Sequence, residues 1–270
     1  MSELNQNQSF NYSSFSDFCF HKDELPAETR HTVEVLLKVA GTDDYLEAER
    51  VLLDETKLHL CDREIIDLSP LASLNILTDL NLLENEIYDF TPLQNIKKIA
   101  YLNLGENKIT DITPLKKITN ITKIALYANK ITDINPLKKL TKLTELSLHT
   151  NQIKDIEPLK ALINLEQISF QSNQISDISS LELLNNLRDI RLDDNQIENI
   201  TVLRNLIKLR YLSIDKNKII DISAIKYLAN LYYLALSHNH INDLTPVENL
   251  RKLSLLKTFV LCAIALLNFP

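Results

Sequence analysis

The sequence predicts a solenoid, a fold in which copies of one short unit stack along an axis. Three observations predict it. Asparagine recurs every 22 residues from Asn85 to Asn239 without an insertion or deletion. Each of these asparagines follows two apolar residues that are separated by one position, and each is followed two residues later by isoleucine. A unit of this size cannot bury its apolar side chains alone, so neighbouring units must stack.

The apolar pair in each unit predicts a short β-strand. Alternate residues of a strand point to opposite faces, so Leu80 and Leu82 should enter the core while the residues beside them face outward. The pattern L-x-L-x-x-N at a fixed period of this length is typical of leucine-rich repeats. We therefore expect an α/β horseshoe-like leucine-rich repeat solenoid with a parallel, concave β-sheet. The convex side should consist of 3₁₀ and turn segments, because each unit leaves no room for a full helix.

The repeated asparagine is expected to hold the turn after the strand. Buried backbone groups need hydrogen-bond partners, and an asparagine amide offers both a donor and an acceptor. Stacked asparagines would form a structural ladder along the coil. The Asp and Pro of "DITPL" suit a tight turn on the outer side. The expected ladder consists of Asn85, Asn107, Asn129, Asn151, Asn173, Asn195, Asn217 and Asn239.

Four segments divide the chain. Residues 1–14 are polar and expected to be disordered, and 15–55 should form a helical N-terminal cap with helices in "LPAETRHTVEVLLKVAG" and "TDDYLEAERVLLDE". Residues 56–250 hold about nine repeats, and in the first of them Arg63 stands at the asparagine position. Residues 251–270 are strongly apolar where a polar end is expected. They form a degenerate strand folded back over the core, an edge for self-association, or the end of a truncated longer chain.

Composition limits the function. The formal charge of −7 argues against general nucleic-acid binding. Two glycines are too few for a phosphate-binding loop, and three widely spaced cysteines indicate neither a disulfide framework nor a zinc site. No apolar run reaches the roughly 20 residues of a membrane span, and the N-terminus lacks the features of a secretory signal. We expect a cytoplasmic protein without a cofactor, and a secreted form stays open.

The repeat L-x-x-L-x-L-x-x-N-x-I-x-D-I-x-P-L-x-x-L resembles the short, internalin-like leucine-rich repeat, which phosphatase-regulating repeat proteins share. The match extends from about Thr56 to Val247. The resemblance implies a curved solenoid whose parallel strands line a concave face for a protein partner. It leaves two functional alternatives, a secreted or surface adhesion module and an intracellular regulatory subunit of an enzyme such as a phosphatase.

The outward strand positions vary while the core positions do not, so a partner site is expected there. Tyr and Arg are over-represented among residues that carry binding energy at interfaces. Two clusters are expected on the concave face. The first consists of Tyr101, Lys123 and Tyr127, and the second is centred on Asp189, Arg191, Asp193, Tyr211, Asp215 and Tyr233.

Other chemistry is less well supported by the sequence. His238 and His240 are better explained as two surface histidines than as a metal site. His59 and Cys61 start roughly 6.5 Å apart on one strand, too far for a nucleophile and its base, so no enzyme is expected. A stripe of convex lysines lacks the interleaved aromatic residues of a nucleic-acid site and is predicted to be solvated. Its members are Lys97, Lys98, Lys116, Lys117, Lys138, Lys139, Lys142 and Lys160.

Overall fold

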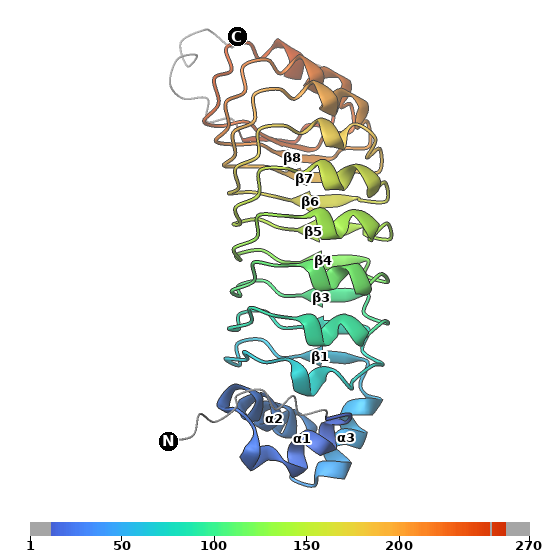
Figure 1. Ribbon diagram of the computed structural model, residues 1–270. Coiled ribbons are helices and arrows are strands. Elements are labelled where there is room, and N and C mark those ends of the chain that lie inside the picture. Colours follow the sequence, from blue (N-terminus) through green and yellow to red (C-terminus); the bar gives the residue numbers. More distant parts are fainter. Residues whose placement is uncertain (1–11, 249, 258–270) are drawn as a thin grey trace, which may run out of the picture.

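A computed structural model describes residues 12–248 and 250–257 and shows a solenoid with a helical cap at one end (Figure 1). Its ten strands form one parallel sheet in sequence order. Each strand pairs with the next at an offset of one repeat, so that Leu80 lies beside Leu102 and Leu102 beside Ile124. The predicted solenoid is confirmed. The strands are β1 (Lys57–His59), β2 (Asp79–Asn81), β3 (Tyr101–Asn103), β4 (Lys123–Ala125), β5 (Glu145–Ser147), β6 (Gln167–Ser169), β7 (Asp189–Arg191), β8 (Tyr211–Ser213), β9 (Tyr233–Ala235) and β10 (Leu255–Lys257).

Short 3₁₀ helices lie opposite the sheet, as the repeat length predicts (Figure 1). Before all but one of them an Asp accepts a hydrogen bond from the backbone two residues later, as Asp111 Oδ1 does from Thr113 N at 2.8 Å. Asn199 makes the same bond to Thr201 N at 2.9 Å, which explains why this exception is tolerated. The helices are η2 (Ser69–Leu71), η3 (Thr91–Asn95), η4 (Thr113–Lys117), η5 (Asn135–Lys139), η6 (Glu157–Ala161), η7 (Ser179–Leu181), η8 (Thr201–Asn205), η9 (Ser223–Tyr227) and η10 (Thr245–Val247).

The core is a continuous column of aliphatic side chains between the sheet and the 3₁₀ helices. In the coil from Ile131 to Leu148, for example, seven aliphatic side chains are each at most 2% exposed. Full burial of one such side chain contributes about 1.5–3 kcal/mol. Each coil is covered by its neighbours on both sides, so this stabilisation depends on stacking. The seven are Ile131, Ile134, Leu137, Leu140, Leu143, Leu146 and Leu148.

The side chains of the ladder asparagines hydrogen-bond to backbone groups and not to one another. In Asn107, Nδ2 donates to the carbonyl oxygens of Leu82, Leu104 and Gly105 at 2.9–3.2 Å. Its Oδ1 accepts from Ile87 N, one coil earlier, at 2.9 Å. The other seven asparagines repeat this pattern. Each amide therefore joins two coils and satisfies carbonyl groups that the turn would otherwise leave unpaired.

The residue before each ladder asparagine has a left-handed backbone. Its φ lies between 50° and 58° in all eight repeats, although none of these residues is glycine. Such a conformation brings Cβ close to the following carbonyl oxygen and costs about 1–2 kcal/mol per residue. The turn is thus strained in every coil, and the asparagine hydrogen bonds offset the strain. The residues are Glu84, Glu106, Ala128, Thr150, Ser172, Asp194, Lys216 and His238.

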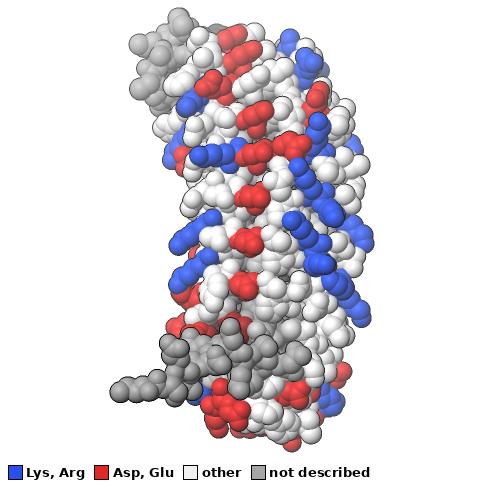
Figure 2. Space-filling model, viewed as in Figure 1, with Lys and Arg blue, Asp and Glu red and all other residues white. Residues whose placement is uncertain are grey.

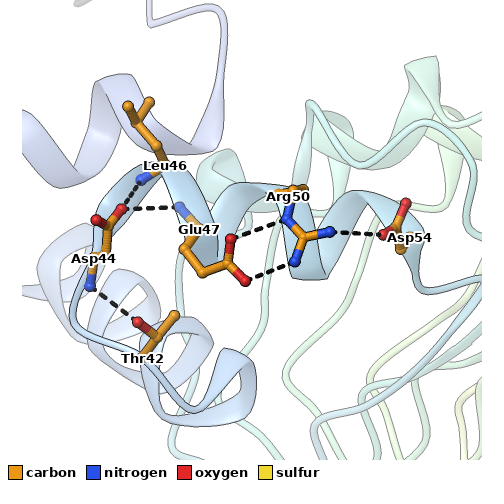
Figure 3. Close-up of polar contacts among 6 residues, drawn as sticks. All are labelled: Thr42, Asp44, Leu46, Glu47, Arg50 and Asp54. Atoms are coloured by element: carbon orange, nitrogen blue, oxygen red, sulfur yellow. Dashed lines mark hydrogen bonds and ion pairs between the residues drawn. The ribbon is translucent and has the colours of Figure 1, made fainter.

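The cap contains α1 (Phe15–Phe20), η1 (Lys22–Glu24), α2 (Ala27–Ala40) and α3 (Tyr45–Asp54). The sequence predicted the two longer helices and missed α1. Ser14 begins α1 through a capping box with Asp17, so residues 12–14 belong to the cap and not to a disordered tail. At the start of α3, Asp44 Oδ1 accepts from the backbone of Leu46 and Glu47 at 3.0 Å (Figure 3).

The cap is attached to the first coil by specific bonds from α2. Thr29 Oγ1 donates to the Asp67 carboxylate at 2.6 Å, and Thr32 Oγ1 donates to the Asp67 carbonyl at 2.7 Å. His31 Nε2 donates to the carbonyl of Arg63 at 2.6 Å. The coil with the imperfect repeat is therefore the one that carries the cap.

The last described strand, β10, extends the sheet in register, with Leu256 beside Leu234. The backbone thus forms a tenth coil through Lys257 and does not fold back before that residue. The expectation for the apolar end concerns mainly residues 258–270, which lie outside the described residues.

Candidate functional site

The concave face presents the outward strand positions in three parallel rows. The register places Tyr101 beside Lys123, and Tyr211 beside Tyr233, as the repeat predicts. Residues two positions beyond each strand, such as Tyr127 and His149, form the third row. The rows are held by a rigid sheet, so the side chains on them are positioned before any partner arrives.

The first expected cluster comes together around Asn103. Its Oδ1 accepts a hydrogen bond from Gly105 N at 3.0 Å, and burial raises the pKa of the neighbouring Tyr101 and Tyr127 above their ordinary values. Tyr127 lies over Gly105, where an added Cβ would be 2.6 Å from the ring. The Tyr127 ring also stacks on His149, with centroids 4.5 Å apart and planes at 9°. Gly105 thus makes room for a fixed aromatic pair.

Lys123, the third member of that cluster, is paired along the sheet. Its Nζ lies 2.6 Å from a carboxylate oxygen of Glu145 on β5. The hydrogen bond with Glu145 raises the pKa of Lys123. The pair is exposed, so it adds little stability and mainly fixes the lysine in place.

The second expected cluster is a stack of three side chains across β7, β8 and β9. Arg191 donates two hydrogen bonds of 3.1 Å to Asp189, and its guanidinium lies 4.7 Å from the centre of the Tyr211 ring. The rings of Tyr211 and Tyr233 are parallel, with centroids 4.1 Å apart. Burial, followed by the hydrogen bond with Tyr233, raises the pKa of Tyr211 to about 12. The stack is preorganised and remains half-exposed.

Asp193 and Asp215 are engaged within the sheet. Asp193 Oδ1 accepts from Ser213 Oγ at 2.5 Å and from Asp215 N at 2.9 Å. Asp215 Oδ1 accepts from Ser237 N at 2.6 Å. Burial raises the pKa of Asp215, and the nearby Asp193 adds to this effect. These two carboxylates link neighbouring coils, a role that the sequence interpretation as partner-binding residues did not include.

A hollow of about 340 Å³ lies between the two clusters. Tyr101 and Lys123 line one end of it, and Asp189 and Arg191 line the other. Its floor is low because three consecutive coils carry small side chains at the second outward position. The sequence interpretation missed this central region, although the small residues were a usable signal. The lining residues that it missed are Ala125, Glu145, Ser147, His149, Gln167, Ser169 and Gln171.

The hollow is close to neutral. The charged side chains at its two ends form the ion pairs Lys123–Glu145 and Arg191–Asp189. Burial lowers the pKa of His149, which favours its neutral form. The groups left to recognise a ligand are aromatic rings, amides and hydroxyls. Such a surface suits uncharged polar and aromatic groups better than a highly charged ligand.

The alternative chemistries gain no geometric support. Among residues 12–248 and 250–257, no group of three or more His, Cys, Asp or Glu could hold a metal ion. His238 and His240 are both exposed, and Cys61 and Cys19 are free cysteines. Burial raises the pKa of Cys19 to about 12, so its thiol is unreactive. In the same part of the chain no helix is long and apolar enough to cross a membrane.

Comparison with known proteins places this geometry in a class. A family model described as "Leucine Rich repeats (2 copies)" matches residues 97–139 and 119–161. The crystal structure of the internalin InlF from Listeria monocytogenes is 36% identical, with a TM-score of 0.73, over 76% of this chain and 62% of that one. Internalin C2 from the same species is 30% identical, with a TM-score of 0.64, over 83% of this chain and 91% of that one. The chain matches no curated protein sequence.

These matches define a leucine-rich repeat protein, a class that serves as a scaffold for protein–protein interactions and is typically non-catalytic. More narrowly, the chain belongs to the internalin-like family. The functional domain of InlJ from L. monocytogenes is 27% identical over 77% of this chain and 49% of that one, with a TM-score of 0.58, and is described as including a cysteine ladder. The ladder of the present chain is made of asparagine.

Proposed function

We propose that the chain is a non-catalytic scaffold that binds a protein partner on its concave face. The partner covers the central hollow and contacts both walls, Tyr101, Lys123 and Tyr127 on one side and Asp189, Arg191, Tyr211 and Tyr233 on the other. Asp193 and Asp215 support the second wall from within the sheet. A standard interface of about 800 Å² per partner would fit this face.

The observation that carries the proposal is the stack of Arg191, Tyr211 and Tyr233. Aromatic and Arg side chains are enriched in the residues that dominate binding energy. Here they are already immobilised, since the Asp189 pair and the parallel rings hold them in one arrangement. Little further side-chain entropy is lost on binding, which favours affinity. The solenoid core does not require these residues, because their positions vary along the repeats.

Affinity capture with matched variants tests the proposal. Wild type is compared with Tyr211→Ala/Tyr233→Ala on the concave face and with the control Lys130→Ala/Lys218→Ala on exposed positions outside it. We expect one protein to be retained by wild type and by the control and to be lost with the tyrosine variant. Circular dichroism confirms that both variants are folded. Equal retention by all three proteins would show that the concave face is not the site.

The similarity to internalins supports an adhesion module over a regulatory subunit of an enzyme such as a phosphatase. Two relatives of at least 30% identity are internalins. The capture experiment is therefore run on an extracellular fraction and, separately, on a cytosolic fraction. A specific partner in the extracellular fraction supports adhesion. A specific partner that is a cytosolic enzyme supports the regulatory alternative.

A further inference from the structure

One edge of the solenoid carries a dense group of lysines that the concave site does not use. The eight lysines that the sequence placed in a convex stripe all lie at the ends of η3 to η6 or just after these helices, and all are exposed. Figure 2 shows Lys and Arg side chains along both margins of this face, on either side of a central column of Asp and Glu, and the eight lysines share one margin because they occupy equivalent or neighbouring positions of the repeat. The margin is strongly basic in a protein whose formal charge is −7.

Few carboxylates lie on this edge itself, although a column of Asp and Glu runs beside it (Figure 2). The sequence contains no Asp or Glu in 94–100, 116–122 or 138–144, which form the edge in three consecutive coils, and the equivalent segment 160–166 of the next coil contains only Glu166. Of its eight lysines, all in the described part of the chain, only Lys138 forms an ion pair, with Glu157 at 3.0 Å. Such a concentration of like charge is unfavourable in the free protein and is relieved when an anionic partner binds.

In the following coils the same edge gains exposed apolar side chains, which lie among the exposed cations Arg204, Lys208 and Lys226. Ile163, Leu183, Ile207 and Tyr227 occupy equivalent or neighbouring positions there and are 52–60% exposed. Single exposed apolar side chains are ordinary, but four in consecutive coils along one edge form a strip. The strip continues directly from the lysines, because Lys160 and Ile163 belong to the same coil.

The backbone of this edge is held in place by a second set of asparagines. Asn120 Nδ2 donates to the Lys97 carbonyl at 2.7 Å, and Asn164 Nδ2 donates to the Thr141 carbonyl at 2.8 Å. In the apolar half, Asn186 and Asn230 make the same bond to the carbonyls of Ile163 and Ile207 at 3.1 and 2.9 Å. The basic and apolar halves thus share one rigid frame.

We propose that this edge is a second docking surface, which takes an amphipathic helical segment of a partner protein that is acidic in its first half and presents apolar side chains in its second, where apolar residues of the edge lie among Arg204, Lys208 and Lys226. Parallel strands lie about 4.8 Å apart, so the seven coils from Lys97 to Tyr227 span about 30 Å. Side chains three or four apart on a helix are about 5–6 Å apart, close to this spacing. At 1.5 Å per residue, a helix of about 20 residues covers the edge.

Acidic groups beside the apolar half argue for a protein segment over a nucleic acid or an anionic membrane. Glu182 adjoins Leu183, and a neighbouring groove of about 560 Å³ is lined by Asp177, Glu182 and Glu198 with Arg204 as its one cation. These carboxylates repel a uniformly anionic polymer or surface. A nucleic acid also gains little from the strip, which offers one aromatic ring for base stacking, that of Tyr227, and Lys226 Nζ lies 5.1 Å from the centre of this ring.

The test measures binding of a fluorescein-labelled, 20-residue synthetic helix by fluorescence anisotropy. The helix carries Glu on one face of its N-terminal half and Leu on the same face of its C-terminal half, and a second peptide has Ser in place of Leu. A 20-nucleotide oligothymidylate and phosphatidylserine vesicles represent the other classes. Lys116→Glu/Lys139→Glu is the edge variant, and Lys130→Glu/Lys218→Glu is the control with the same change in net charge.

We expect the edge variant to bind the Glu–Leu peptide at least tenfold more weakly than wild type and the control to stay within threefold. Leu183→Ser/Ile207→Ser should weaken binding of the Glu–Leu peptide at least threefold and leave the affinity for the Glu–Ser peptide unchanged. Tyr211→Ala/Tyr233→Ala should have no effect, which separates this surface from the concave site. The proposal would be overturned if the edge and control variants lost equal affinity for the Glu–Leu peptide, or if wild type did not bind this peptide. It would also be overturned if wild type bound oligothymidylate or the vesicles more tightly than the Glu–Leu peptide.

Discussion

Replacing Asn151 by Ala should destabilise the protein by about 4 kcal/mol. The side chain is 9% exposed, and its Nδ2 donates to the carbonyls of Leu126, Leu148 and His149 at 3.0–3.3 Å. Its Oδ1 accepts from Ile131 N at 3.0 Å. The amide has two N–H hydrogens and one accepting oxygen in use, equivalent to three full bonds of about 1 kcal/mol net each, and burying the freed donor and acceptors without partners adds about 1 kcal/mol.

The ladder contains its own control. Asn129 makes the same four bonds, with distances of 2.9–3.1 Å, but it is only half-buried. Water can replace part of what Asn129→Ala removes, so we expect a loss of about 2 kcal/mol. Urea unfolding, monitored by circular dichroism, gives both values. If the unfolding free energy depends on urea concentration with the same slope as in wild type, the variants expose the same surface on unfolding. If both variants lost the same unfolding free energy, or if Asn151→Ala lost less than about 1 kcal/mol, the role assigned to the buried amide would be refuted.

Three further predictions concern the turn, the aromatic pair and a half-buried carboxylate. Ala128→Gly should raise the unfolding free energy by about 0.5–1 kcal/mol because it relieves a φ of 50°, whereas Ala125→Gly in the neighbouring strand should lower it; thermal unfolding distinguishes the two. Gly105→Ala should displace the Tyr127 ring and expose His149, so the pKa of His149 measured by NMR rises toward its ordinary value, and an unchanged pKa would contradict the packing. Asp215→Asn should stabilise the protein at pH 7 by about 0.5 kcal/mol. Burial raises the pKa of Asp215, so the ionised form costs stability above that pKa. The cost disappears as the pH falls below the ordinary Asp value of about 3.9, and the gain measured by urea unfolding should vanish there.

The amino-acid pattern alone determined most of the architecture. A period of 22 residues without insertions specifies the stacking, the strand register and the buried positions, because any shift of one residue would turn the apolar pair outward. The same pattern separated the outward positions, including Tyr101, Arg191 and Tyr211, from the core. It predicted α2 and α3 from their caps and apolar faces. It missed α1, because a helix of six residues is too short to show the periodic spacing of apolar residues.

Only the tertiary structure decided which outward residues act together. The side chains of Tyr127 and His149 stack because Gly105 leaves space in the coil before, a relation between residues more than 20 positions apart. Asp193 and Asp215, which read as free carboxylates in the sequence, are bound to backbone groups of the next coil. The central hollow and the continuous basic and apolar edge likewise arise from side chains in different coils. Repeats bring such residues together in space, and their rotamers and hydrogen bonds then determine what surface they form.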